Sequence, residues 1–193
     1  MHRLALTAPR EVPLDVARWF APADAADETV LARCRGPVLD VGCGPGRLVS
    51  ALNQRGIAAL GVDVAETAVT LTRGQGLPAL LRSVFQDLPG EGRWPTVLLL
   101  DGNVGIGGDP RRLLERVRTL LRQGGQVIVE TDADPAADDR RHLWFTEGGV
   151  PVTAPIEWAS VGLQPLRAYA RAAGYSVTED WVVAGRTFAA LTR

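Results

Sequence analysis

Three glycines and two acids stand at spacings that suit a ligand containing a ribose. Asp40 is followed by Gly42, Gly44 and Gly46 in the run DVGCGPG. Glycine lets the backbone adopt positive φ and lets a ligand approach the main chain closely. Asp63 follows about 20 residues later, the separation at which an acid meets ribose hydroxyls in a βαβ unit. The pattern predicts a ligand held between a glycine turn and a carboxylate.

The spacing separates this turn from two common phosphate-binding turns. A dinucleotide fingerprint, G-x-G-x-x-G/A, needs a small last residue so that helix and strand pack closely. Counted from Gly42, that position is Arg47. A P-loop needs a lysine, and the chain contains none. A strand, turn and helix that bind no ligand stay open as the alternative.

The run D-x-G-x-G-x-G resembles the first motif of the class I S-adenosylmethionine-dependent methyltransferases, and Asp63 matches the second. The resemblance extends over residues 36–131, where the run L-x-x-G-G precedes an apolar strand. It implies S-adenosyl-L-methionine as cofactor, with the turn around its methionine part, Asp40 toward its amino end and Asp63 on the ribose. The run DGNVGIGGDP at 101–110 resembles a loop of a bacterial subgroup of small methyltransferases.

The family also implies a set of cofactor-binding positions. Where the family usually has an acid for the adenine amino group, this chain has Val84. Adenine recognition is therefore expected to rest on backbone groups and on apolar contact from Val84 and Phe85, with Asp87 a less favoured substitute. The residues expected to bind the cofactor are Asp40, Gly42, Cys43, Gly44, Gly46, Asp63, Val64, Val84, Phe85, Asp101, Gly102 and Asn103.

No residue pattern identifies a catalytic base. Methyl transfer from a sulfonium needs an aligned acceptor, exclusion of water and removal of a proton if the acceptor carries one. The catalytic candidates are Asp101, Asn103 and His142. Glu130 and Asp132 also come into question, because they share a face at one strand end. No metal site is expected, because Cys34 and Cys43 lack ligand spacing.

The elements that must position these residues alternate between strands and helices. Short apolar runs predict parallel strands at 38–41, 58–63, 79–85, 96–101 and 126–131, with helices at 65–73, 111–122 and 162–173 among them. A closing pair, 175–183 and 186–191, turns at Ala184-Gly185. We predict an α/β fold: a Rossmann-like seven-stranded sheet flanked by helices, its last strand antiparallel, with a β-hairpin inserted after strand 5.

The whole chain, 1–193, is expected to form one domain with a helical cap at 1–35 and a hairpin lid within 132–158. In the cap, residues 1–12 are expected to be extended or frayed. A helix at 14–20 is followed by one that Asp24 or Asp27 caps and that runs to about Arg35. Trp19 and Phe20 belong either to a lid or to the core.

The hairpin lid is predicted from two strand patterns, 140–147 and 150–158, that meet at Gly148-Gly149. Three aromatic residues lie on it: Trp144, Phe145 and Trp158. They either line an acceptor pocket or dock the hairpin on the body, and the sequence leaves both readings open.

The composition of the chain limits the kinds of molecule that it is expected to bind. A net charge of −1 and a pI near 6.1 argue against binding to nucleic acid or an anionic membrane. No signal-like or membrane-length apolar run is present, so a cytoplasmic protein is expected, as a monomer or homodimer. The expected function is methyl transfer to an O, N or C atom of a small molecule. The alternative is a protein of the same fold that binds the cofactor without transfer.

We predict that S-adenosylhomocysteine binds and that NAD(P) does not, because Arg47 occupies the position that a dinucleotide turn reserves for a small residue. Calorimetric titration of each ligand tests this. Tight NAD(P) binding without S-adenosylhomocysteine binding would contradict it.

Overall fold

The computed structural model describes residues 3–6, 16–147, 150–151 and 155–193. Its main feature is a seven-stranded sheet in the order β10-β11-β6-β5-β2-β3-β4. Strand β11 is antiparallel to both neighbours, and the other pairs are parallel, which confirms the predicted fold class. The strands are β2 (Val38–Val41), β3 (Ala59–Asp63), β4 (Ala79–Leu81), β5 (Trp94–Leu99), β6 (Leu121–Thr131), β10 (Ser176–Val183) and β11 (Arg186–Thr192).

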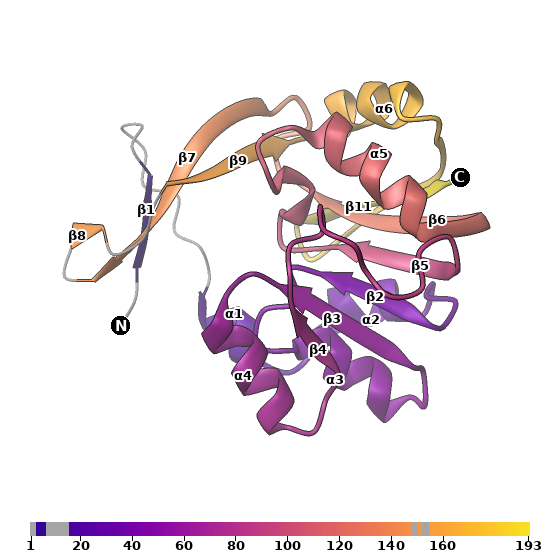
Figure 1. Cartoon of the computed structure of the whole chain (residues 1–193). Helices are drawn as coiled ribbons and strands as arrows, with labels where there is room; N and C mark the ends of the chain where they lie inside the picture. Colours follow the sequence, from indigo (N-terminus) through magenta and orange to yellow (C-terminus); the bar gives the residue numbers. More distant parts are fainter. Residues whose placement is uncertain (1–2, 7–15, 148–149, 152–154) are drawn as a thin grey trace.

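Helices cover both faces of this sheet (Figure 1). They are α2 (Ala25–Leu31), α3 (Arg47–Gln54), α4 (Glu66–Gly74), α5 (Pro110–Leu120) and α6 (Leu163–Ala172). Alternate residues of β5 point to opposite faces: Val97 packs with α5 and α6, whereas Leu98 packs with α2 and α3. Burial on both faces explains why the central strands are continuous apolar runs rather than alternating ones.

In the N-terminal part, residues 3–6 are extended, as one of the two expectations had it, and form strand β1 (Arg3–Leu6). This strand pairs with residues 143–146, a pairing that was not predicted because the partner lies far along the chain. Helix α1 (Val16–Phe20) follows, and residues 1–2 and 7–15 lie outside the described part. Asp24 caps α2, accepting the amide N–H of Asp27 at 2.8 Å, while Asp27 serves as the reciprocal residue of a capping box. The helix ends at Leu31, short of Arg35.

The insertion after β6 forms a separate sheet. Strand β7 (Asp138–Glu147) pairs with β1, with β8 (Val150–Pro151) and with β9 (Ile156–Val161). The described residues of the predicted second strand lie in β8 and in β9, and β9 extends beyond Trp158. The turn predicted at 148–149 lies outside the described residues. We call β1, β7, β8 and β9 the arm. It projects from the body on the side where α1 lies (Figure 1).

Three other predicted boundaries were wrong. Strand β4 ends at Leu81 rather than Phe85, because the chain turns over residues 83–86 with the amide of Gln86 donating to Ser83 O at 3.1 Å. The expected turn at 123–125 belongs to β6. Strand β5 ends at Leu99, so Asp101 lies in the loop that follows.

Gly105 gives the clearest test of how the arm docks. A Cβ at Gly105 would lie 1.9 Å from the carbonyl oxygen of Ala159 in β9, and overpacking of this kind costs about 1–3 kcal/mol or more. We expect Gly105→Ala to lower the free energy of unfolding measured in urea. Gly74→Ala is the control, because nothing lies within 4 Å of a Cβ there. Equal unfolding free energies for the two variants would show that β9 does not pack as described.

Candidate functional site

The carboxyl ends of four parallel strands bring acids to one edge of the sheet. Asp40 is the third residue of the four-residue strand β2, and Asp63 is the last residue of β3. Asp101 follows β5, and Glu130 lies near the end of β6. Parallel strands present these ends at a common edge, which is where open α/β sheets bind ligands. The predicted acids are therefore gathered, except that Asp132 lies at the base of the arm, where its amide donates to Val161 O at 2.8 Å.

The glycine turn is shaped for close approach. Its three glycines all have positive φ: Gly42 at 71°, Gly44 at 54° and Gly46 at 89°. A Cβ at Gly44 would meet nothing within 4 Å, so the turn faces open space there. At Gly42 a Cβ would lie 2.5 Å from the amide nitrogen of Asn103, which donates to Val41 O at 2.8 Å and Gly42 O at 3.0 Å. Asn103 thus fixes the turn from a loop sixty residues further along.

Asp63 is joined to the same turn. Its Oδ2 accepts the amide N–H of Gly44 at 2.9 Å, and its Oδ1 accepts that of Ala65 at 2.8 Å. Each carboxylate oxygen has a second lone-pair direction for a ligand hydroxyl. Beside it, Val64 is 67 % exposed and Leu81 is 46 % exposed, with Leu81 paired to Asp63 in the sheet. The edge therefore offers an acid next to an exposed apolar surface, which suits a ribose joined to a flat ring.

Of the two side chains expected at the adenine, Val84 is buried and Phe85 is half-buried, so the contact from Phe85 stays a prediction. The Val84 side chain is buried in the core, and its carbonyl accepts Arg116 Nε at 2.8 Å, so Leu81 and Val64 are the exposed apolar groups instead. Phe85 packs against Gly107, with the Arg112 guanidinium 4.7 Å from its ring centroid.

Cys43 also turns inward. Its side chain is buried, and a Cβ at Gly61 would lie 2.5 Å from its Sγ. Burial, with Asp40 nearby, raises the pKa of the thiol. Cys43 thus offers a ligand its backbone rather than its sulfur.

A charge network behind the turn was missed by the sequence reasoning. The buried Arg47 guanidinium pairs with the buried carboxylate of Asp27, and its Nη2 lies 2.5 Å from Asp101 Oδ2. In the sequence, Arg47 indicated only that the turn does not bind a dinucleotide, and Asp27 indicated only a possible helix cap. A charged residue directly after the glycine turn, where a helix packs on the sheet, was the available signal, because a buried charge needs a partner.

Two further arginines join this network. Arg186 lies 2.9 Å from Asp27 and 2.7 Å from Glu130, and Arg18 lies 3.2 Å from Asp27 and 3.7 Å from Asp101. We call Arg18, Asp24, Asp27, Arg47, Asp101, Glu130 and Arg186 the charge network. It joins α1, α2 and α3 to the ends of β5 and β6 and to the start of β11.

Asp101 occupies an unusual backbone conformation. Its φ of 53° lies in the left-handed region, which costs a non-glycine residue of the order of 1 kcal/mol. Its amide donates to Glu130 Oε2 at 2.8 Å, and Glu130 is held in turn by two contacts of 2.7 Å from Arg186. Glu130 and Arg186 therefore hold the bend after β5.

Burial and pairing set the pKa values of three acids here. Burial raises the pKa of Asp27, but hydrogen bonds from Arg47, from the Asp24 amide and from Arg186 outweigh it, so the pKa lies below its ordinary value. Burial raises the pKa of Asp101 despite the opposing charge of Arg47. Burial, with the nearby charge of Asp101, raises the pKa of Asp40 to about 7. Within the described part of the chain, Asp40 Oδ2 has no hydrogen-bond partner.

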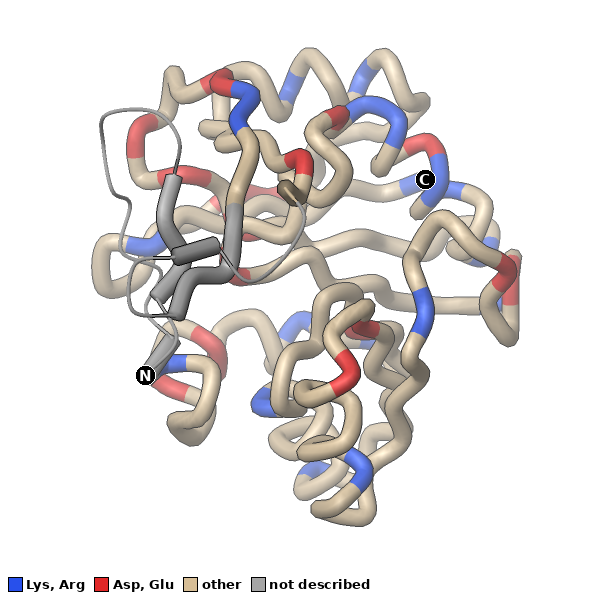
Figure 2. The backbone as a smooth tube through the Cα atoms, turned by 60° about the vertical axis from the view of Figure 1, so that its left-hand side comes forward, with Lys and Arg blue, Asp and Glu red and all other residues tan. Residues whose placement is uncertain are grey.

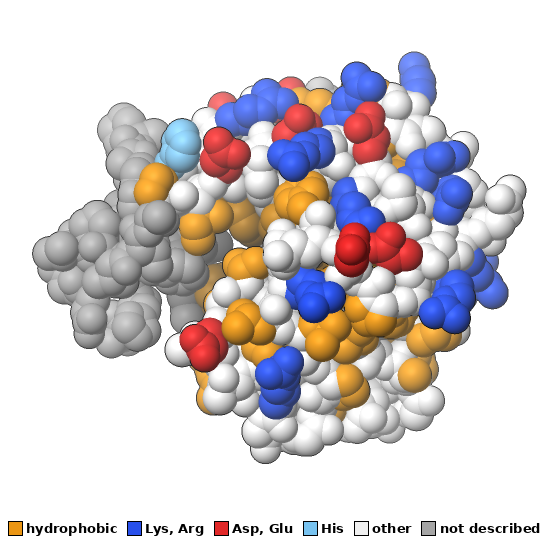
Figure 3. Space-filling view, in the orientation of Figure 1, with side chains coloured by type: hydrophobic (Ala, Val, Ile, Leu, Met, Phe, Trp, Pro, Cys, Tyr) orange, Lys and Arg blue, Asp and Glu red, His pale blue; other side chains and the backbone are white. Residues whose placement is uncertain are grey.

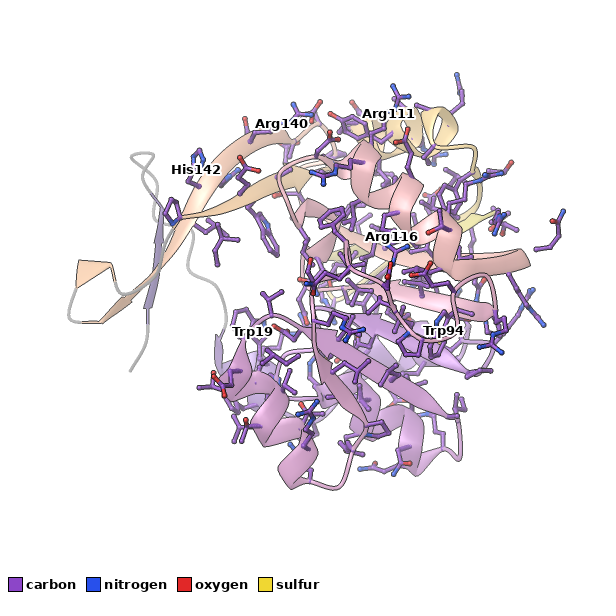
Figure 4. All side chains as sticks on the ribbon, viewed as in Figure 1. Trp19, Trp94, Arg111, Arg116, Arg140 and His142 are labelled. Atoms are coloured by element: carbon purple, nitrogen blue, oxygen red, sulfur yellow. The ribbon has the colours of Figure 1, made fainter. Side chains whose placement is uncertain are left out.

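His142 is not brought to this edge. It is exposed on β7, and Figure 4 shows it with Arg140 on the upper side of the arm, whereas Trp19 lies below. The side chains of Trp144 and Phe145 lie outside the described set, while Trp158 is half-buried with its indole nitrogen beside Gly105. Over the described ranges no helix is long and apolar enough to cross a membrane. No group of three or more His, Cys, Asp or Glu residues there has a metal-binding arrangement.

Comparison with known proteins gives three kinds of match. A family model described as "Methyltransferase domain" matches residues 20–180. A ubiquinone biosynthesis O-methyltransferase from Pseudomonas paraeruginosa is 30% identical over 103 residues, which is 49% of this chain and 43% of the relative. The matched stretch is thus less than half the length of the curated relative.

Two solved structures share the fold. An S-adenosylhomocysteine complex of a methyltransferase from Bacteroides fragilis has a TM-score of 0.84 at 23% identity, covering 99% of this chain and 86% of that one. A 1,6-didemethyltoxoflavin-N1-methyltransferase from Burkholderia thailandensis has a TM-score of 0.66 at 21% identity, covering 93% and 81%.

The buried Asp40 predicts a pH dependence of stability. Its pKa in the folded state is raised to about 7. The contribution of Asp40 to the free energy of unfolding is therefore largest below the unfolded-state pKa of about 3.9, and it is lost as the pH rises toward 7. Asp40→Asn does not titrate. We expect urea unfolding to show the variant gaining on the wild type by the order of 1–4 kcal/mol between pH 4 and 7. If the difference in unfolding free energy between variant and wild type stays constant with pH, the pKa of Asp40 is not raised.

Proposed function

Because the chain belongs to the methyltransferase domain family, we propose that it is an S-adenosylmethionine-dependent methyltransferase acting on a small-molecule acceptor. The family expected from residues 36–131 is confirmed, since the family model spans residues 20–180. The observation that carries the proposal is the open glycine turn fixed to Asp63 and Asn103.

The edge of the sheet fits S-adenosyl-L-methionine in three parts. Gly44 leaves room for the methionine part, Asp63 has free acceptor directions for the ribose, and Val64 with Leu81 offers an apolar surface for adenine. Of the arginines in the charge network, Arg18 is the most exposed and suits the carboxylate of the methionine part. The Bacteroides fragilis and Burkholderia thailandensis structures were both obtained with S-adenosylhomocysteine. When bound, the cofactor supplies the activated methyl group.

This chain's own residues align the reactants and exclude water, and few of them suit proton transfer. Asp101, whose pKa is raised by burial, is the best placed acceptor of a proton, although Arg47 engages its carboxylate. Asn103 is occupied by the glycine turn, and His142 lies on the far side of the arm. Alignment of the two reactants is then the main catalytic device. The same observations favour, as second candidate, a protein that binds the cofactor without methyl transfer.

A small acceptor is supported by the relatives and by the charges. One relative is named for ubiquinone biosynthesis, and one solved structure holds 1,6-didemethyltoxoflavin. Basic positions are spread along the chain between acidic and uncharged ones rather than gathered on one face in the view of Figure 2. We propose residues 1–35 as a cap and 132–158 as a lid over the acceptor within one domain, 1–193. A cytoplasmic location stays a prediction.

Asp63 tests cofactor binding. Loss of a charge-assisted hydrogen-bond acceptor costs about 1.5–3 kcal/mol, so Asp63→Ala should weaken S-adenosylhomocysteine binding about 10- to 100-fold in calorimetry. Asp63→Asn keeps one acceptor for the Gly44 amide and separates ligand loss from distortion of the turn. Glu115→Ala, an exposed acid on α5, is the control. An unchanged dissociation constant for both Asp63 variants would place the ribose elsewhere.

Transfer itself is tested by incubating the protein with S-adenosylmethionine and a panel of phenols, amines and aromatic acids and measuring S-adenosylhomocysteine. Production above the acceptor-free rate supports the enzyme. Tight binding without production across the panel favours the second candidate.

A further inference from the structure

The two faces of the arm differ in what they touch. In an antiparallel pair, residues directly opposite each other share a face, and neighbours along a strand alternate between faces. Arg140 therefore lies on one face with its partner Ala159, and Arg141 lies on the other with its partner Trp158. Arg140 Nε donates to Gly108 O at 2.9 Å. Figure 4 shows Arg140 on the upper side of the arm, whereas Trp19 lies below the arm. The register puts Arg141 and Trp158 on the face opposite Arg140.

Trp158 stands next to the loop that fixes the glycine turn. Its backbone pairs with Ile106, and its indole nitrogen would be 2.8 Å from a Cβ at Gly105. Gly105 is two residues from Asn103, which binds the turn itself. The half-buried Ile156 adds an apolar neighbour. Figure 3 shows hydrophobic side chains on the recessed surface beneath the arm.

Arg141 carries a charge with little compensation. Its side chain is only 21 % exposed, whereas its ion-pair partner in the described part of the chain, Asp139, is 73 % exposed and lies 3.4 Å away. A pair at that distance with one partner in solvent contributes little, and it engages one of the five N–H donors of the guanidinium. The carboxylates at the sheet edge do not repel an anionic ligand beside Arg141, because Arg47 and Arg186 already neutralise Asp101 and Glu130.

We propose that Arg141 and Trp158 bind the acceptor, and that this acceptor is a flat aromatic molecule carrying a carboxylate. The inference rests on the proposed function and names the acceptor class of that same site. The indole provides a face on which an aromatic ring stacks. The guanidinium provides the paired donors that match a carboxylate. Arg140 does neither, because it is fixed to Gly108 on the opposite face.

The test compares two probes of the same shape, 2-naphthoate and its neutral amide, 2-naphthamide, titrated into the protein saturated with S-adenosylhomocysteine. We expect the carboxylate to bind about tenfold or more tightly than the amide, as one charge-assisted contact predicts. Arg141→Gln should remove that preference by weakening naphthoate alone. Arg140→Gln, the matched control on the neighbouring residue, should keep it. Trp158→Leu should weaken both probes.

The outcomes separate this inference from the proposed function. If S-adenosylhomocysteine does not bind when the protein is titrated with it before the probes are added, the proposed function fails. If it binds but the two probes bind equally, or neither binds at millimolar concentration, the acceptor class is wrong. Loss of the preference in Arg140→Gln but not in Arg141→Gln would overturn the assignment of the two faces.

Discussion

The interaction on which the rest of the site depends is the buried bridge that Arg47 makes between Asp27 and Asp101. Removing one partner of such a bridge leaves a buried charge and costs about 3–5 kcal/mol. Arg47 directly follows the glycine turn, Asp27 belongs to α2, and Asp101 begins the loop after β5. Because separating these charges is costly, the turn, helix α2 and the loop assemble together, and the edge of the sheet that binds the cofactor is formed before a ligand arrives.

The loop at 101–108 connects these elements to the arm. Asp101 bends with positive φ while Glu130 accepts its amide, and Asn103 then reaches back to the glycine turn. Two residues later Gly105 sits so close to β9 that a side chain would not fit, and Trp158 lies against it. A single loop thus contacts both the glycine turn and the face of the arm that we propose binds the acceptor, so it links the two proposed binding sites.

The features that could be predicted from the sequence are those that neighbouring residues determine. The glycine turn, the acid ending β3 and the buried β5 are each specified by neighbouring residues, and the structure has them near the predicted positions. The pairing of β1 with β7 and the contact of Arg186 with Asp27 join residues more than a hundred positions apart. Val84 shows the same limit. At the end of a predicted strand, an apolar residue looks the same in the sequence whether its side chain faces a ligand or the core, and in the structure Val84 packs in one core cluster with residues of α5.

The most direct measurement is a crystal structure of the complex with S-adenosylhomocysteine. We predict that the ribose hydroxyls bind Asp63, that the adenine lies over Val64 and Leu81, and that Arg47 still bridges Asp27 and Asp101. A ligand bound elsewhere would contradict the site. A ligand at this edge with Arg47 released from Asp101 would contradict the claim that the bridge forms the site in advance.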